Sequence, residues 1–419
     1  MANCIIAQSG GPTSVINASV VGLVKANKEH RLYDKVFGGI NGIEGILRED
    51  FIDLTNVSDE ELETFKLTPS SGLGSCRYKL KSYETDEEEY KKLIEICNKN
   101  DIKSFFYIGG NDSMDTIAKL STYGKKHNID INFVGIPKTI DNDLPITDHT
   151  PGYGSAAKFI ATSVLETYLD SCVYTNNGIF ILETMGRDTG WLAAAASVAR
   201  MNNVPVADFI YLPEHPFEVD SFLKDISERF KEQNQVYIVV SEGIRSKDGG
   251  FISELTPSQT HDSFGHSQLG GVANVLKSFI IEAGITKRVK TLELGVLQRC
   301  AMHCSSETDI MEAYEAGYFA LLNASPENSG SMVAIKREAD APYSSSSFLT
   351  EAKNIANHVK YVPNSWINEE GNNITEDAYN YIKPLIGKSP VLVLENNLPK
   401  YKVYNKEKVK KDKHTVNKA

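Results

Sequence analysis

Short apolar runs alternate with amphipathic stretches along most of the chain. The apolar runs predict strands at residues 3–8, 35–37, 104–108, 132–136, 178–183, 208–212, 235–241, 290–294 and 331–336. The stretches between them predict helices at 14–25, 86–99, 114–126, 155–170, 191–200, 220–231, 267–283 and 309–324. Regular alternation of strand and helix favours parallel sheets and an α/β fold.

The pattern weakens in three regions. Residues 46–70 are polar and irregular, 341–348 are rich in serine, and 364–378 are polar. Residues 389–394 (SPVLVL) form a further strand candidate. From Lys400 the chain is rich in lysine, with few apolar residues after Tyr404, so we expect a mobile tail.

A charged loop follows the predicted strand at 132–136. It carries Lys138, Asp141, Asp143 and Asp148 within a few residues of one another. Doubly wound sheets bind ligands at the carboxyl ends of their strands. One cation beside several carboxylates suits a site that holds a metal, deprotonates a hydroxyl and meets a phosphate. The alternative is a solvated acidic loop without chemistry.

Glycine turns follow two other predicted strands. Residues 9–12 (SGGP) end the first strand, and Gly109 and Gly110 precede Asn111 and Asp112 at the start of a helix. Such turns let backbone N–H groups approach a phosphate at the positive end of a helix. Neither turn matches GxGxxG or GxxxxGK[ST], so a tight turn without a ligand is the alternative.

A lone arginine, Arg77, follows a flexible run of serine and glycine at residues 70–76. It can be a surface charge or a phosphate clamp.

Length, charge and cysteine content narrow the class of protein. At 419 residues, two or three domains are expected. The net charge of -11 argues against general nucleic-acid binding. The six cysteines show no CxxC spacing, which favours reduced thiols over disulfides or a zinc site. No apolar window reaches the roughly 18 residues of a membrane span, and no signal peptide is recognised, so a cytoplasmic protein without membrane contact is expected.

Seven segments, read together, resemble the phosphofructokinase family and its pyrophosphate-dependent branch. They are SGGPTSVINA, GSCR, GGNDS, PKTIDND, ETMGRDTGW, SEG and LGVLQR, in the family's order over roughly residues 4 to 310. The resemblance implies an α/β protein with two similar Rossmann-like three-layer domains, mainly parallel sheets and an active site in the cleft between them. It places a phosphoryl-donor domain at 1–150 plus about 300–350 and a sugar-phosphate domain at about 151–299 plus about 351–399. Residues 400–419 are left as the tail.

The resemblance also implies roles for residues, carried over by position. Asp141 would be the base that takes the proton from the sugar's 1-hydroxyl, framed by Thr139, Ile140 and Asp143. Gly10 would contact the donor phosphate through its backbone, with Arg77 near the donor. The residues implied to hold fructose 6-phosphate are Met185, Gly186, Arg187, Glu242, Val296, Leu297, Gln298 and Arg299.

Two residues indicate the donor. ATP-using relatives have glycine at the positions of Asp112 and Lys138. A carboxylate at Asp112 would fill the space of the nucleotide's α-phosphate and repel it, whereas Lys138 would add positive charge beside the transferred group. The alternative is that Asp112 caps the following helix and that Lys138 only neutralises the charge of Asp112.

Three positions depart from the family pattern. Asn111 stands where ATP-using relatives have an aspartate that serves Mg²⁺, and Asn111 is therefore the expected metal ligand. Val296 replaces a histidine that contacts the sugar phosphate. Gly178 replaces an arginine that many relatives lend to a neighbouring subunit, and Lys290 is a candidate substitute.

The sequence therefore predicts a Mg²⁺-dependent enzyme that transfers a phosphoryl group reversibly from pyrophosphate to fructose 6-phosphate. A homo-oligomer, dimer or tetramer, is expected. Alternatives are an ATP-dependent 6-phosphofructokinase and a non-catalytic regulatory subunit, although Asp141, Arg187 and Arg299 are all retained. A nicotinamide-dependent oxidoreductase would need GxGxxG and a later acidic residue, which are missing.

Overall fold

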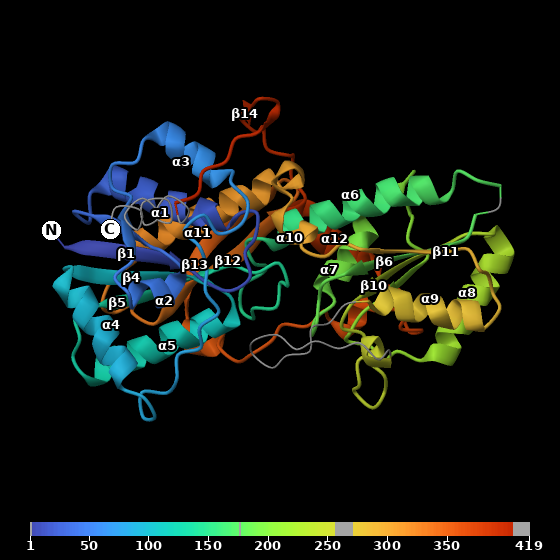
Figure 1. The fold of residues 1–419 in the computed structure, drawn as a ribbon, viewed down its shortest axis with the longest axis horizontal. Helices are drawn as coiled ribbons and strands as arrows, with labels where there is room; N and C mark the ends of the chain where they lie inside the picture. The colour runs from blue at the N-terminus through green and yellow to red at the C-terminus, as the bar shows by residue number, and fades with distance from the viewer. Residues whose placement is uncertain (1, 176, 256–270, 405–419) are drawn as a thin grey trace, which may run out of the picture. The chain divides into compact units, whose positions relative to one another are not determined.

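The computed structural model describes residues 2–175, 177–255 and 271–404 (Figure 1). The chain divides into two compact units. Unit 1 comprises Met1–Ser155, Arg299–Val359 and Gly387–Ala419. Unit 2 comprises Ala156–Gln298 and Lys360–Ile386. Each unit is built around a largely or wholly parallel sheet, so the predicted α/β fold is confirmed.

Unit 1 contains a seven-stranded sheet in the order β13-β12-β5-β4-β1-β2-β3. Its strands are β1 (Asn3–Gln8), β2 (Val36–Gly39), β3 (Phe51–Asp53), β4 (Ile102–Gly109), β5 (Asn132–Pro137), β12 (Ser331–Asp340) and β13 (Tyr343–Glu351). All neighbouring pairs are parallel except for the two edge strands, β3 and β13.

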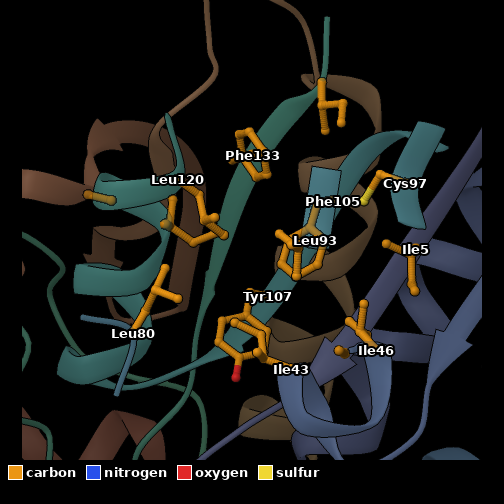
Figure 2. Packing of buried hydrophobic residues seen from close by; sticks show 14 of the residues in the cluster. Ile5, Ile43, Ile46, Leu80, Leu93, Cys97, Phe105, Tyr107, Leu120 and Phe133 are labelled. Atoms are coloured by element: carbon orange, nitrogen blue, oxygen red, sulfur yellow. The ribbon is translucent and has the colours of Figure 1, made fainter. Parts of the chain in front are cut away.

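Helices cover both faces of this sheet. They are α1 (Ile16–His30), α2 (Gly42–Ile46), α3 (Asp59–Lys66), α4 (Glu88–Lys99), α5 (Asn111–Lys126) and α11 (Glu307–Leu322). Successive residues of a strand point to opposite faces. Accordingly Ile5 packs in the cluster with α4 and α5, whereas Ile6 packs in the cluster with α1 and α11. Figure 2 shows the first cluster, where Phe105 and Phe133 of the strands lie with Leu93 of α4. The central strands are largely apolar, as expected for strands with both faces buried.

Unit 2 contains a four-stranded parallel sheet in the order β11-β6-β10-β9. Its strands are β6 (Ile179–Thr184), β9 (Phe209–Tyr211), β10 (Val236–Ser241) and β11 (Val289–Glu293), and a separate hairpin joins β7 (Arg200–Met201) and β8 (Val204–Pro205). Its helices are α6 (Tyr153–Ser171), whose first turn belongs to unit 1, α7 (Trp191–Ala194), α8 (Val219–Gln233), α9 (Val272–Glu282) and α12 (Glu376–Ile382). The side chains of α8 and α9 pack on one face of the sheet, and Tyr237 on the other face hydrogen bonds to Thr167 of α6.

Several predicted elements differ from the structure. The alanine-rich stretch 191–200 is α7 followed by a 3₁₀ helix, Ala195–Val198, and then β7. The irregular region 46–70 holds β3 and α3, and the serine-rich region 341–348 lies largely within β13, whose pairing with β12 does not depend on apolar side chains. Of the predicted strand 389–394, only Leu394 is in a strand, β14 (Leu394–Glu395), which pairs with β15 (Leu398–Pro399). The predicted helix 267–283 is α9 within the described residues, and 267–270 lie outside them.

The C-terminal segment from Gly387 groups with unit 1, whereas the sequence-based boundaries assigned residues up to 399 to the second domain. The described end of the tail is also anchored. The Lys402 N–H donates to Thr68 Oγ1 at 2.9 Å, and the Tyr404 N–H donates to the Gly72 carbonyl at 2.9 Å. Tyr404 is buried against Phe65, so the expected mobility does not hold for residues 400–404. Residues 405–419 lie outside the described structure.

Within the described ranges, no helix has both the length and the apolar character that crossing a membrane requires.

Candidate active site

Three of the predicted site segments follow neighbouring strands of unit 1. β5, β4 and β1 are adjacent and parallel, so the loops after them start at the same edge of the sheet. The segments concerned are residues 9–12, 138–143 and 110–113, of which 111–113 begin α5. The Lys138 N–H donates at 3.0 Å to the carbonyl of Gly109, the last residue of β4, which joins the segment after β5 to the end of β4.

Lys138 is the centre of a charged cluster. Its side chain is buried, and Nζ donates to the Gly11 carbonyl at 2.6 Å. The charged groups that act on its ammonium are Asp141, Asp143, Arg299 and Arg77. Burial lowers the pKa of Lys138 to about 8, the two carboxylates oppose this shift, and the two arginines add to it. Arg77 and Arg299, which the sequence analysis placed in other segments, therefore act on the same buried ammonium as the two carboxylates of its own loop.

Glycine is required beside this ammonium. Gly10 has a φ of +72°, and a Cβ there would lie 3.2 Å from Lys138 Nζ. Its N–H donates to the Cys76 carbonyl at 2.9 Å, and the Ser75 hydroxyl donates to the Gly10 carbonyl at 2.7 Å. These bonds attach the segment that carries Arg77 to the first glycine turn.

Asp141 is held by its own loop. The Thr139 hydroxyl donates to Asp141 Oδ2 at 3.3 Å, and the Asp141 N–H donates to Thr139 Oγ1 at 3.1 Å. The Thr139 N–H donates to the Pro151 carbonyl at 3.2 Å, and Ile140 is buried. The structure thus fixes the backbone around the predicted base.

Asp148, grouped with these residues by sequence, lies in a different set of contacts. It accepts hydrogen bonds from His149 and from Arg337. Its role is considered below with the rest of that set.

The glycine turn after β4 leads directly into α5, with Asn111 and Asp112 in the first turn. The Asn111 amide donates to the Ile355 and His358 carbonyls at 3.2 and 2.6 Å, and its oxygen accepts from the Asn357 N–H at 2.6 Å. Asn111 therefore braces the segment after β13, which leaves one lone pair of its oxygen for another partner. Across the residues whose placement is described, no three or more His, Cys, Asp or Glu side chains gather as a metal site.

The predicted sugar-phosphate residues of unit 2 also follow adjacent parallel strands. Met185, Gly186 and Arg187 follow β6, and Glu242 follows β10. The Gly186 N–H donates to Glu242 Oε1 at 3.2 Å. Gly186 has a φ of +130°, and a Cβ there would lie 2.6 Å from the Thr189 carbonyl oxygen, so only glycine fits this turn.

Gln298 lies at the same edge, in the short helix α10 (Leu297–Cys300) that follows β11. Its side-chain oxygen accepts from the Met185 N–H at 3.1 Å, and its amide donates to the Gly295 carbonyl at 2.9 Å. Val296 and Leu297 are exposed. Lys290 forms an exposed ion pair with Asp170 at 3.2 Å and does not join this group.

Arg299 belongs to unit 1, although it directly follows Gln298 of unit 2. A Cβ on Gly11 would lie 3.3 Å from Arg299 Nη1, and Arg299 acts on the Lys138 ammonium. Arg299, which the sequence analysis had grouped with Arg187, therefore also contributes to the cluster around Lys138.

The sequence analysis overlooked Glu183, which lies within the apolar strand β6. Its two carboxylate oxygens accept from the Gly271 and Ala273 N–H groups at 3.0 and 2.9 Å, at the amino end of α9. Burial raises the pKa of Glu183 to about 7. The sequence signal for these buried contacts was a carboxylate inside an apolar run, because a buried carboxylate needs hydrogen-bond partners.

The chain is similar to known proteins over most of its length. The model of the phosphofructokinase family matches residues 3–322. A pyrophosphate--fructose 6-phosphate 1-phosphotransferase of Halomonas elongata is 41% identical over 412 residues, which cover 98% of this chain and 97% of that protein. One of Methylococcus capsulatus is 41% identical over 402 residues, 95% of each chain. The crystal structure of a pyrophosphate-dependent phosphofructokinase from Nitrosospira multiformis superposes with a TM-score of 0.86 at 37% identity and covers 96% of this chain and 95% of that one.

Proposed function

Since the chain belongs to the phosphofructokinase family, we propose a phosphoryl-transfer function. The phosphoryl group passes reversibly from pyrophosphate to the 1-hydroxyl of fructose 6-phosphate. The products are fructose 1,6-bisphosphate and phosphate. The observation that carries the proposal is the buried Lys138 ammonium with Asp141, Asp143, Arg77 and Arg299 around it. This cluster joins a base to concentrated positive charge in a protein with a net charge of -11.

Asp141 is the proposed base. It takes the proton of the 1-hydroxyl while that oxygen forms a bond to the terminal phosphorus of pyrophosphate, and the bond from this phosphorus to the bridging oxygen breaks. The leaving group is phosphate. Such a transfer needs alignment and charge stabilisation more than covalent help from the protein.

Lys138, Arg77 and Arg299 are proposed to stabilise the charge on the transferred group and on pyrophosphate. Their positive charges oppose the charge that develops on the phosphoryl oxygens. The glycine turn at Gly10 lets the backbone approach the donor phosphate, because a side chain there would crowd Lys138.

Unit 2 is proposed to hold fructose 6-phosphate. Arg187 supplies a guanidinium for the sugar phosphate, and Glu242 and Gln298 hold the turn of Met185 and Gly186 through its N–H groups. Val296 and Leu297 are exposed beside these residues and belong to the same proposal.

Mg²⁺ is the proposed cofactor, and the donor set fits a metal that arrives with pyrophosphate. Mg²⁺ usually keeps several waters and binds one or two protein oxygens plus substrate phosphates, so it does not need a cluster of three or more protein ligands, and none is found among the described residues. The one available lone pair of the Asn111 oxygen makes this residue a candidate ligand. When bound, the metal would neutralise part of the charge of the phosphates.

The choice of donor follows from Asp112 and Lys138 together. Asp112 stands at the start of α5, where a helix favours a carboxylate, and this explains Asp112 alone. It does not explain the buried Lys138 beside the same turn, which serves the transferred phosphoryl group in our proposal.

The test is an assay of the purified protein with fructose 6-phosphate and Mg²⁺, with pyrophosphate in one sample and ATP in another. We expect fructose 1,6-bisphosphate only with pyrophosphate. Equal turnover of ATP would support the alternative ATP-dependent kinase, and no turnover of either donor would support a non-catalytic subunit.

A cytoplasmic location and a homo-oligomer, dimer or tetramer, belong to the same proposal. Cell fractionation and light scattering of the purified protein test them, and a monomer in solution would refute the second.

A further inference from the structure

A buried histidine lies between two carboxylates in unit 1, outside the residues given a role above. His149 is fully buried. Its Nδ1 lies 2.8 Å from Asp148 Oδ1, and its Nε2 lies 2.7 Å from Glu312 Oε2 of α11. The two contacts therefore use both ring nitrogens.

The hydrogen-bond chemistry of this arrangement requires a protonated ring. A neutral imidazole has one N–H, and an ionised carboxylate can only accept. The pKa values of Asp148 and Glu312 are both lowered, which favours ionised carboxylates. With both carboxyls ionised, both contacts are hydrogen bonds at once only when the ring carries two protons. Burial alone would lower the pKa of His149, but Glu312 and Asp148 raise it to about 9.

The surrounding groups compensate the buried charges. Arg337 donates to Asp148 Oδ1 from Nε and Nη2 at 3.1 and 3.0 Å. Glu312 Oε1 accepts from the Tyr343 hydroxyl at 2.5 Å and from the Ser345 hydroxyl at 2.7 Å. The titratable or charged groups of this set and its immediate neighbours are Asp148, Glu312, Arg337, Tyr343, Asp309 and Asp340.

The residues after His149 hold the loop that carries Asp141. The Thr150 hydroxyl donates to the Thr139 carbonyl at 2.8 Å, and the Thr150 N–H donates to Asn142 Oδ1 at 3.2 Å. Asn142, which follows Asp141, and Thr139, two residues before it, are thus both held by Thr150, and Thr139 also bonds to Asp141 directly.

α11 holds the far end of the same segment. Asp309, one turn from Glu312 on this helix, accepts from the Gly152 and Ser155 N–H groups, each at 2.8 Å. Glu312 and Asp309 therefore fix the segment that runs from His149 to the start of α6. The loop around Asp141 is hydrogen bonded to this fixed segment through Thr150.

We propose that His149 is a positioning residue: its imidazolium, held between Asp148 and Glu312, fixes the loop that aims Asp141 at the sugar hydroxyl. This inference rests on the proposed function. His149 itself is enclosed and touches no substrate, so it acts through Asp141.

The first test replaces His149 with Gln, which keeps a polar side chain but supplies neither the charge nor two ring donors. A displacement of about 1 Å can cost about 10²-fold in rate. We expect the kcat of His149→Gln to fall about 10²-fold while the dissociation constant for fructose 6-phosphate, measured by calorimetry, stays within about twofold. The control is His127→Gln, which replaces a partly exposed histidine at the end of α5 and keeps wild-type kcat. An active wild type with an equally active His149→Gln overturns the positioning role alone, whereas an inactive wild type refutes the proposed function.

A double-mutant cycle separates positioning from general damage. If His149 acts through Asp141, adding His149→Gln to Asp141→Asn should change the residual kcat by less than about threefold. An additional 10²-fold loss in this background would show independent action and overturn the proposal. If His149→Gln does not fold, Glu312→Gln takes its place in the cycle with the same expectations.

The ring's charge has a direct readout. Imidazole ¹³C and ¹⁵N shifts, assigned by their loss in the variant, should be those of a protonated ring at pH 7.5. Glu312→Gln removes one of the two stabilising charges and should bring deprotonation to a lower pH than in the wild type. A neutral ring at pH 7.5 in the wild-type protein would overturn the proposal.

Discussion

At the scale of single residues, the charge of Lys138 is the most finely balanced feature of the site. Its pKa is lowered to about 8, first by burial and then by Arg299 and Arg77, and it would be lower still without Asp141 and Asp143. The ammonium of the free enzyme is therefore protonated at neutral pH and loses its proton near pH 8.

We expect kcat/KM for pyrophosphate to decline as pH rises through about 8, because the free enzyme then loses the charge that meets the phosphoryl group. Arginine stays protonated, so Lys138→Arg should lack this decline even if its activity is lower. Rates measured from pH 6.5 to 9.5 provide the check. A wild-type profile that stays flat to pH 9.5 would contradict the role of the Lys138 charge.

Asp141 is predicted to be the base on the evidence of its fixed position beside that ammonium. Asn in its place keeps shape and removes basicity, and general-base catalysis typically contributes about 10²- to 10⁴-fold. Steady-state kinetics of Asp141→Asn should show kcat reduced by that order with little change in sugar binding. Near-normal turnover would rule the role out.

Asp112 is predicted to select the donor. Two unit charges about 4 Å apart at an effective dielectric near 20 repel by roughly 4 kcal/mol, which is about a thousandfold in affinity. Asp112→Gly should therefore lower the KM for ATP, most clearly when it is combined with Lys138→Gly, while Asp115→Gly on the same helix should not. If the double variant still discriminates against ATP as strongly as the wild type, Asp112 does not select the donor.

At the scale of elements, α1 and α11 pack closely against each other at two glycines. A Cβ on Gly317 would lie 1.9 Å from the Ser19 carbonyl oxygen, and one on Gly22 would lie 1.9 Å from the Tyr314 carbonyl oxygen. Backbone atoms cannot yield as a flexible side chain does, so the two helices touch because both positions are glycine. The placement of α11 sets the positions of Asp309 and Glu312.

We expect Gly317→Ala to destabilise the protein by about 1–3 kcal/mol, as overpacking does, and to lower kcat because α11 moves. Gly124→Ala is the matched control. It is also inside a helix, where its Cβ would meet Phe133 at an ordinary 3.4 Å, and alanine there should be neutral or stabilising by up to about 1 kcal/mol. The melting temperatures of the two variants are the measurement. Equal melting temperatures would show that the contact between α1 and α11 does not require glycine at position 317.

At the scale of the whole molecule, the predicted substrate groups are divided between two units. Lys138, Asp141, Arg77 and Arg299 belong to unit 1, whereas Arg187 belongs to unit 2. Arg299 adjoins the Lys138 cluster, so we expect Arg299→Ala to affect kcat and the KM for pyrophosphate and not only the sugar.

The division predicts separable binding defects. Arg187→Ala should raise the KM for fructose 6-phosphate about 10- to 100-fold, since a hydrogen bond to a charged group contributes about 1.5–3 kcal/mol. The KM for pyrophosphate should stay within about twofold. A rise confined to the KM for pyrophosphate would show that Arg187 binds the donor and not the sugar phosphate.

The sequence by itself determined the central strands, the turns that end them and the identity of the residues at those turns. These features are local, because a buried parallel strand needs an apolar run and the turn after it needs glycine or a polar residue within a few positions. The same local reasoning missed β13, whose serines pair with β12 through the backbone, and wrongly extended one helix over 191–200.

Only the tertiary structure decided which distant residues share a site. It brought Arg299 to Lys138, and it set Glu312 against His149, 163 positions away in the chain. No pattern within one segment specifies such contacts, because they depend on how α11 packs against α1 and on the order of strands in the sheet. A buried charge is stable only beside its partner, and the fold alone supplies that partner.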